Sequence, residues 1–354
     1  MLKFLKSWYN RYFTDPEAAL LAVLLIISFV ILYFMGTMLA PILTAIVIAY
    51  LLEGAVAAIE KRNLPRLLAV NLVFLLFIAF LVFLVLFLLP IISRQTSQFI
   101  QDLPRMIKKG QELLFSLSSQ YPEVFAKDSI QELISSFSGE VTGIGQSILS
   151  VSFASIPVII IYLILVPLMS FFFLKDKIEI IEWMSRFLPA DRSLITHLWR
   201  EMDAQMGNYI RGKFYEIVIV GAAAYIMFKI FGLNFAPLLA LMVGLSVLIP
   251  YIGAASVTVP LAFVAYFQWG FGSDFGWIIF FYFVLQSLDG YVLVPILFSD
   301  VVNLHAVAII ASVLVFGGLW GFWGVFFAIP LATLVKALIN IWPTRQEAAE
   351  ASAD

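Results

Sequence analysis

The chain has 354 residues, of which 62% are hydrophobic and only 12% are charged, and its mean hydropathy is +1.01. A soluble domain is about 45–50% apolar and about 25% charged, so this composition excludes an ordinary soluble fold and predicts that the lipid bilayer is a partner. The net charge of −2 gives no indication of a nucleic-acid partner. The absence of cysteine excludes disulfides, thiolate metal sites and a cysteine nucleophile.

The first half of the chain predicts four membrane-spanning helices. The apolar stretch 18–39 follows a basic N-terminus and has about the 20 residues that cross a bilayer, so we expect a retained first helix rather than a cleaved signal peptide. Segments 41–59 and 67–92 complete a membrane region over residues 1–92, and a fourth segment covers 151–174. Backbone polar groups must be satisfied internally in hydrocarbon, so these segments are predicted to be helical.

Two polar stretches interrupt the apolar segments. In 93–150, apolar residues recur at helical spacing, which predicts a small helical extracytoplasmic domain that either caps the bundle or contacts neighbouring subunits. In 175–213, a basic amphipathic helix is expected to lie at the inner membrane surface. Its apolar face contains Ile195, Leu198, Trp199, Met202, Met206, Tyr209 and Ile210.

The distribution of basic residues predicts the orientation. If both termini are cytoplasmic, 15 of the 21 Lys and Arg residues lie on the inner side, as the positive-inside tendency requires. Residues 344–354 then form a cytoplasmic tail. Glu216 follows Lys213 by three residues, so the two can pair on one helix face. Glu53 ends the second apolar segment near the inner surface, and we expect both glutamates at the membrane interface.

The C-terminal transmembrane domain, 214–343, begins with an ordinary span over 214–231 and contains another over 275–298. It also contains two apolar stretches, 236–268 and 304–341, that are too long for one straight span and are broken by proline and glycine. The residues expected to shape these breaks are Pro250, Gly253 and Pro260 in the first stretch and Gly317, Gly318, Gly321, Gly324 and Pro330 in the second.

The two broken stretches share an order of features. The tripeptides Pro260-Leu261-Ala262 and Pro330-Leu331-Ala332 lie 70 residues apart, which indicates an internal repeat, although chance in a Leu- and Ala-rich chain is the alternative. Paired interrupted segments of this kind point to a transporter's binding site near the middle of the membrane. We therefore expect an all-α polytopic membrane protein with about six spanning helices plus two broken or re-entrant hairpins, or else eight spans.

Asp289 is the most informative polar residue, because it lies near the middle of an apolar run. An aspartate at the centre of a membrane helix costs roughly 2.5–3.5 kcal/mol on insertion scales, and such residues usually face a cavity or a partner. Gln286 lies one turn earlier on the same face. His305, which opens the second broken stretch, is a further candidate because it can titrate near neutral pH. The structural alternatives are a hydrogen-bonded Asp289 that joins helices and an interfacial His305.

The sequence contains no enzyme motif. It lacks HExxH, Walker A and a complete GxGxxG, and with two histidines and no cysteine it offers almost no nucleophile–base pair or metal site. We therefore expect no enzymatic activity, no cofactor and no bound metal.

From about residue 15 to 343 the chain resembles the autoinducer-2 exporter transporter family. The residues that carry the resemblance are Tyr209-Ile210-Arg211-Gly212-Lys213, Leu248-Ile249-Pro250-Tyr251-Ile252-Gly253, the spacing Gln286, Asp289, Pro295, then Asn303-Leu304-His305 and Gly317–Thr333. The start at Asp15-Pro16-Glu17-Ala18 and the Gly- and Trp-rich tail look most like its PerM-type permease branch. The chain departs from the family pattern at Ala254 and Ala306, where proline is usual, and at Asp289, where glutamate is frequent.

The resemblance implies a bacterial inner-membrane protein, a homo-oligomer, and either export of a small signalling molecule or sodium–proton exchange. Together with the residues it favours an ion-coupled secondary transporter that moves a small solute, in which Asp289 and Gln286 bind the ion or substrate between the broken stretches. A dedicated sodium–proton antiporter is the first alternative. A membrane scaffold that transports nothing is the second.

Overall fold

The computed structural model describes residues 16–120, 156–188, 192–298 and 304–341, and its regular elements there are all helical. In chain order the helices are α2 Pro16–Glu60, α3 Arg66–Phe83, η1 Leu84–Leu88, α4 Leu89–Gln120, α6 Ile156–Lys175, α7 Lys177–Ser185, α8 Ser193–Ile230, α9 Ala236–Ser246, α10 Ile252–Trp269, α11 Ser273–Leu288, η2 Asp289–Leu293, α12 Val294–Phe298, α13 Ala306–Phe326 and α14 Ala328–Ile341. The elements η1 and η2 are single π-helical turns inside longer helices.

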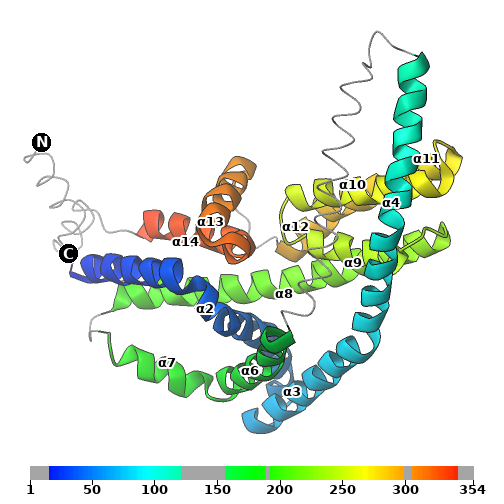
Figure 1. Ribbon diagram of the computed structural model, residues 1–354. Helices are drawn as coiled ribbons and strands as arrows, with labels where there is room; N and C mark the ends of the chain where they lie inside the picture. Colours follow the sequence, from blue (N-terminus) through cyan, green and yellow to red (C-terminus); the bar gives the residue numbers. More distant parts are fainter. Residues whose placement is uncertain (1–15, 121–155, 189–191, 299–303, 342–354) are drawn as a thin grey trace, which may run out of the picture.

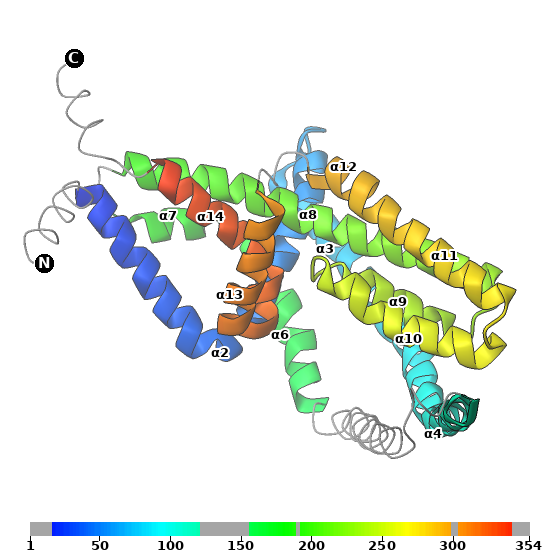
Figure 2. The ribbon, with the colours of Figure 1, turned by 90° about the horizontal axis from the view of Figure 1, so that it is seen from above.

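The centre of the molecule is α8, whose 38 residues extend over about 57 Å at the usual helical rise. The helices α2, α9, α11, α12 and α14 all pack against it. Figures 1 and 2 show α2 and α14 beside its first half and α9 to α12 beside its second half. One helix therefore contacts both C-terminal broken stretches and the N-terminal helix.

Six helices among the described residues are long and apolar enough to cross a membrane, and two shorter apolar helices accompany them. Large apolar side chains remain exposed along them; Phe34 is 76% exposed and Ile26 is 62% exposed. Water does not tolerate so much contiguous apolar surface, whereas lipid does. The expectation of an all-α, multi-pass membrane protein is confirmed.

The membership of the six differs from the sequence prediction. One half of each broken stretch, Ile252–Trp269 and Ala306–Phe326, is among the six, and two changes elsewhere offset this gain. Segments 18–39 and 41–59, predicted as two spans, form the single helix α2, which continues through Pro41. A proline in a helix bends it rather than ending it when the lost hydrogen bond is tolerated, and α2 changes direction about halfway along in Figure 1. Segment 214–231 is not among the six, because it continues the amphipathic helix as part of α8.

The apolar face of that amphipathic region packs inside the protein. Leu198 is buried with Leu21 of α2 and Ala337 of α14, and Tyr209 and Ile210 are buried in a cluster with residues of α13 and α14. The face predicted to lie on the membrane surface is therefore largely covered by other helices. Tertiary packing of the same apolar stripe explains the difference.

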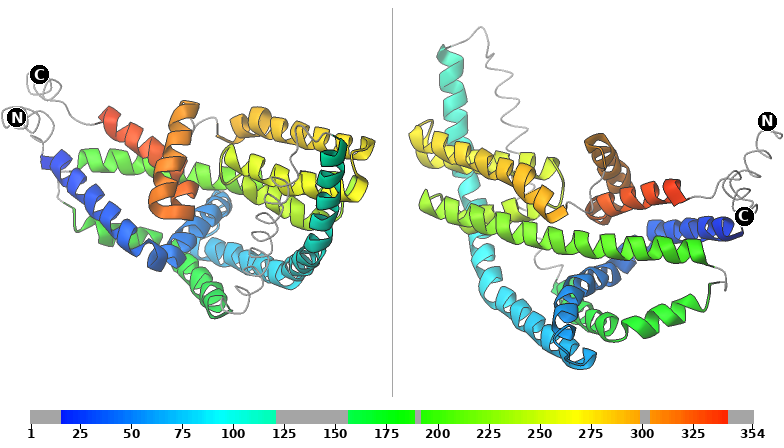
Figure 3. Two further views of the ribbon diagram at one scale, coloured as in Figure 1. Left: turned by 45° about the horizontal axis from the view of Figure 1, so that its top comes forward. Right: turned by 180° about the vertical axis from the view of Figure 1, so that it is seen from behind.

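The polar stretch 93–150 begins in a helix. Residues up to Gln120 belong to α4, which Figure 3 shows projecting beyond the other described helices, and residues 121–150 lie outside the described part. Near its start, Gln95 accepts a hydrogen bond from the backbone N–H of Leu238 at 3.1 Å, which attaches α4 to α9.

Each broken stretch consists of two helices that contact one another: α9 with α10, and α13 with α14. The starts of α9 and α13, Ala236 and Ala306, lie 70 residues apart, the same offset as the Pro-Leu-Ala tripeptides. Between α8 and α9 the chain reverses at Gly232, whose φ is 67°. The N–H of Leu233 bonds the carbonyl of Phe228 there, the pattern of a helix ended by a left-handed glycine.

Candidate functional site

The first break is a short, strained connection between α9 and α10. Tyr251 has a φ of 63° and a ψ of −49°, and the N–H of Ile252 bonds the carbonyl of Pro250 at 2.7 Å. This is a γ-turn of the rare, strained hand, which is costly for a residue with a side chain. The Tyr251 side chain is 60% exposed, so core packing does not explain the conformation. Strain of this kind concentrates at functional sites.

Both breaks are closed by a glycine that touches a backbone carbonyl group on the other side of the break: Gly253 of α10 touches α9, and Gly324 touches the part of α13 before the kink at Gly321. A methyl group on Gly253 would overlap the carbonyl oxygen of Ser246, and a methyl group on Gly324 would overlap that of Phe316. Ser246 and Phe316 lie 70 residues apart, and the two glycines lie 71 apart. The two stretches therefore use the same close backbone approach at corresponding positions, as expected of a repeat.

The helix α8 is hydrogen-bonded to both breaks through side chains one turn apart. The Tyr209 hydroxyl donates to the carbonyl of Phe326, at the end of α13, at 2.8 Å. The Lys213 ammonium donates to the carbonyl of Val247, just after α9, at 2.8 Å. A helix end leaves carbonyls without intrahelical partners, and these two side chains satisfy one such group in each broken stretch.

Beside the first break lies a cavity of about 220 Å³, here called the break cavity. Its walls come from α8, the α9–α10 connection, the π-helical turn η2 and the two halves of the second broken stretch. The lining residues are Lys213, Glu216, Ser246, Val247, Ile249, Pro250, Tyr251, Ala254, Gln286, Asp289, Gly290, Val294, Phe298, Ile309 and Ile329.

Two of the charged residues in this cavity form a buried ion pair. The Lys213 ammonium lies 2.7 Å from a carboxylate oxygen of Glu216, and their side chains are 6% and 3% exposed. The ammonium also lies 5.2 Å from the centre of the Phe298 ring, within range of a cation–π contact. Both residues were expected at the interface, and the structure places them in the protein interior instead.

Asp289 opens the π-helical turn η2 and is half-buried in the wall of the cavity. Its Oδ1 atom is buried and has no hydrogen-bond partner among the described residues. Most buried polar atoms are hydrogen-bonded, so an exception calls for an explanation. Single π-turns within α-helices are frequent at functional sites. A carboxylate oxygen that the protein leaves available in a cavity is suited to bind a proton or a cation.

Gln286 holds the preceding turn against the first break. Its Nε2 donates to the hydroxyl of Tyr282 at 2.8 Å, and this hydroxyl donates to the carbonyl of Ala254 at 2.9 Å. Tyr282 is fully buried. This chain of hydrogen bonds fixes α11 to the start of α10, so that Gln286 and Asp289 line the break cavity together.

Not every predicted site residue reaches this cavity. His305 is exposed at the start of α13, where its Nδ1 accepts a hydrogen bond from the N–H of Val307 at 3.3 Å, so it caps a helix. Pro260 does not interrupt α10, which continues from Ile252 to Trp269. Pro330 lies in the first turn of α14, a position that suits proline.

The glycines of the second break divide among three roles. Gly321 is the kink in α13, with a φ of 57°, and lines a second, larger cavity. Gly317 and Gly324 pack at the hairpin contact, where a methyl group on Gly317 would come within 2.8 Å of Val325. A methyl group on Gly318 would meet nothing within 4 Å.

Lys213 and Glu216 are the residues whose place sequence reasoning misjudged. Their spacing indicated a pair, and Lys213 ends the Tyr-Ile-Arg-Gly-Lys motif that carries the family resemblance. The motif has a packing reason, because a methyl group on Gly212 would come within 2.6 Å of the Phe298 ring beside Lys213. What the sequence could not show is that the hairpins cover this part of α8.

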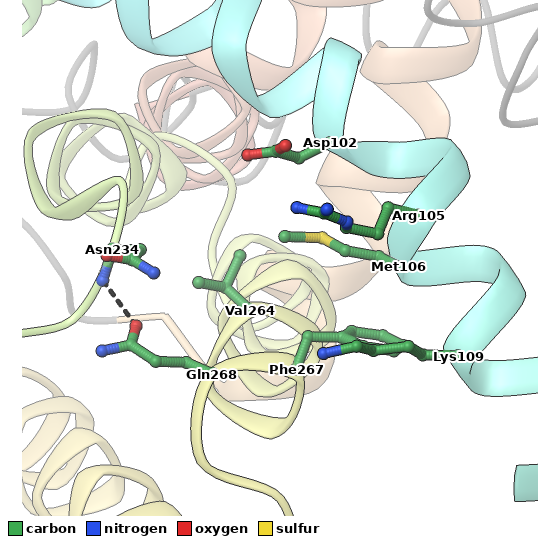
Figure 4. Close-up of a pocket in the computed structure, with 8 residues that line it drawn as sticks. All are labelled: Asp102, Arg105, Met106, Lys109, Asn234, Val264, Phe267 and Gln268. Carbon is green, nitrogen blue, oxygen red and sulfur yellow. Dashed lines mark hydrogen bonds between the residues drawn. The ribbon is translucent and has the colours of Figure 1, made fainter.

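A separate polar cavity of about 180 Å³ lies between α4 and the far ends of α9 and α10 (Figure 4). Asp102, Arg105 and Lys109 of α4 face Gln268, whose carbonyl oxygen accepts a hydrogen bond from the N–H of Asn234 at 2.7 Å. None of the predicted site residues lines it.

Comparisons with known proteins agree with this architecture. The profile described as AI-2E family transporter matches residues 21–344. A protein of Escherichia coli strain K12 named PerM and designated a permease is 45% identical over 99% of this chain and 100% of its own length. YueF of Bacillus subtilis, designated a transport protein, is 29% identical over 87% of this chain and 85% of its own length. A protein of Thermotoga maritima with the same designation is 23% identical over 93% of this chain and 95% of its own length. The chain therefore belongs to the AI-2E family of transporters.

Proposed function

We propose that the protein is an ion-coupled secondary transporter of the bacterial inner membrane that moves a small solute, and that the break cavity binds the coupling ion or part of the solute. The observation that carries the proposal is the unpartnered, buried oxygen of Asp289 in a cavity at the junction of two broken helices. Interrupted helices leave backbone groups available to line such a cavity.

The charge balance of the break cavity favours a cation. Its three charged side chains are Lys213, Glu216 and Asp289, and the ammonium of Lys213 is already paired with Glu216. The cavity therefore has one negative charge in excess when both acids are ionised. A charge in this environment is costly without a partner, so a cation or a proton is the expected occupant.

The hydrogen bonds from α8 suggest how binding is transmitted. Tyr209 is bonded to the second broken stretch and Lys213 to the first, one turn apart on a rigid helix. A cation near Asp289 competes with Lys213 for negative charge. Weakening the contact between Lys213 and Glu216 or Val247 would then free the first hairpin to move relative to α8. This is a two-state device of the kind that alternating access needs.

The resemblance described from the sequence implies two candidate activities. Export of a small signalling molecule is one, and sodium–proton exchange without any organic solute is the other. Sodium–proton exchange is the alternative function, and the excess carboxylate supports it. Such exchange requires an acid that binds a proton and a cation in turn. The two acids of the break cavity meet that requirement without a further group.

Asp289→Asn is expected to abolish ion coupling, because it removes the charge while keeping the shape of the side chain. The purified protein would be reconstituted into vesicles containing a pH-sensitive dye, and proton flux would be followed after adding Na⁺, with and without autoinducer-2. Flux driven by Na⁺ alone identifies an antiporter, and flux that needs the organic solute identifies a coupled transporter. Asp289→Glu should retain part of the flux.

Asp274→Asn is the matched control, because Asp274 lies at the exposed start of the same helix, away from the cavity. It should leave proton flux unchanged. If a folded Asp289→Leu variant kept the full proton flux, the assignment of Asp289 would be wrong. If the wild type itself showed no flux under any of these conditions, a scaffold without transport activity would be favoured.

We propose that both termini lie in the cytoplasm, since with the spans predicted from the sequence this orientation places most of the basic residues on the inner side. The chain has no native cysteine, so a single cysteine at exposed Ser273 can be labelled without background. With this orientation and a first hairpin that re-enters, Ser273 should react with a membrane-impermeant maleimide added from outside. Labelling from the cytoplasmic side alone would refute this topology.

A further inference from the structure

The largest apolar cavity described lies between α2, α6, α8 and the second broken stretch, and shares no lining residue with the break cavity. We call it the aromatic cavity. Its volume is about 920 Å³, within the usual range of about 300–1,000 Å³ for small-molecule sites. The apolar face of the amphipathic part of α8 forms one wall, and the kink at Gly321 contributes to the opposite one.

Aromatic rings dominate these walls. Tyr33 of α2, Trp199 of α8, and Trp320, Phe322, Trp323 and Phe327 at the second break all line the cavity. The Phe316 and Trp320 rings stack with an interplanar angle of 1°, and Phe29 packs edge-on against Trp320, so the central indole is held in place. Ring faces attract cations as well as apolar groups.

One acidic side chain, Asp203 of α8, lies in this apolar wall. The hydroxyl of Tyr50 donates a hydrogen bond to its carboxylate at 2.6 Å. No Lys or Arg forms an ion pair with Asp203 within the described ranges. The indole N–H of Trp320 is buried and likewise has no acceptor among the described residues. The cavity therefore presents one negative charge without a cationic partner among the described residues.

We propose that the aromatic cavity binds a hydrophobic organic cation, with the positive group beside Asp203 and the apolar body among the aromatic rings. Carboxylate and ring faces recognise the same charge, and a half-buried acid in an apolar wall is unfavourable without a counter-charge. A neutral lipid chain would fill the volume and leave the Asp203 carboxylate without a counter-charge. The inference concerns binding and does not depend on transport through the break cavity.

Rhodamine 6G is a suitable probe, because it is a fluorescent hydrophobic cation. Its fluorescence anisotropy would be titrated with the full-length protein in detergent. The wild type should bind it, and Asp203→Asn should weaken binding about tenfold or more. Glu201→Gln, which neutralises an acid on the same helix that is bonded to Gln205 and does not line the cavity, should bind as the wild type does.

A second variant tests the location without touching charge. Gly36 lines the cavity, and a methyl group built on it meets nothing within 4 Å, so Gly36→Leu should place its side chain in the cavity without displacing the backbone of α2. This variant should lose rhodamine 6G binding, whereas Gly276→Leu, equally free of contacts and remote from the cavity, should keep it.

Competition decides whether charge is recognised. Tetraphenylphosphonium, a cation, should displace the probe, and neutral triphenylphosphine oxide should do so at least about tenfold less well. Equal displacement by the two would show an apolar, lipid-type cavity and overturn the proposal. Unchanged binding in either Asp203→Asn or Gly36→Leu would overturn it as well, so a folding failure of one variant leaves the other as a test.

Discussion

Glu216→Ala should be among the most destabilising single substitutions in the protein, lowering the free energy of unfolding by about 3–5 kcal/mol. The reason is that the Lys213 ammonium, 6% exposed, would keep only the carbonyl of Val247 and the Phe298 ring as partners. Removing one member of a buried pair strands the other charge. Lys213→Ala should have a comparable cost and would also release the first break. SDS titration in mixed micelles, followed by tryptophan fluorescence, measures both.

The double variant Lys213→Ala/Glu216→Ala provides the internal check. If the two residues stabilise the protein as a pair, the double variant should lose much less free energy of unfolding than the sum of the two single variants, because no charge is left uncompensated. Lys177→Met is the external control: Lys177 lies 3.3 Å from Glu53 in a pair whose side chains are 33% and 19% exposed, and it should change stability by less than about 1 kcal/mol. Additive losses in the double variant would contradict the buried pair.

Gly253→Ala and Gly324→Ala should each destabilise the protein by about 3 kcal/mol, near the upper end for inserting a methyl group into a packed site. In each case the new methyl group would overlap a backbone carbonyl oxygen, of Ser246 or Phe316, and backbone cannot move aside as a side chain can. The two halves of the hairpin must therefore separate. The loss of stability would be measured as a lower midpoint of thermal unfolding, determined by size-exclusion chromatography of the purified protein after heating.

Gly318→Ala is the matched control for these substitutions. It lies in the same helix as Gly324, and its added methyl group would meet nothing within 4 Å. Because alanine is the better helix former by up to about 1 kcal/mol, Gly318→Ala should leave the midpoint unchanged or raise it slightly. A midpoint for Gly253→Ala equal to that of Gly318→Ala would mean that the hairpins are not closed by these contacts.

The sequence alone determined the class of the protein and indicated the region of its proposed site. Long apolar segments require helices in a membrane whatever their packing, so the all-helical, multi-pass architecture followed from composition and length. Asp289 was identifiable because an acid in an apolar run is costly wherever the helix packs. The offset of 70 residues between the two broken stretches was also visible in the sequence, because proline and glycine mark helix breaks locally.

Only the tertiary structure decided which side chains share a cavity. Lys213 and Glu216 looked interfacial because burial depends on which helices cover α8, and that information is absent from local pattern. Pro41 and Pro260 looked like breaks but lie inside continuous helices, because neighbouring packing can compensate for a missing hydrogen bond. The pattern of the amphipathic segment does not distinguish Asp203, and only the packing of α2 and the second hairpin around α8 puts this residue in the wall of an apolar cavity. Apolar periodicity specifies that a face is buried, and the partners that bury it are set by contacts between residues distant in sequence.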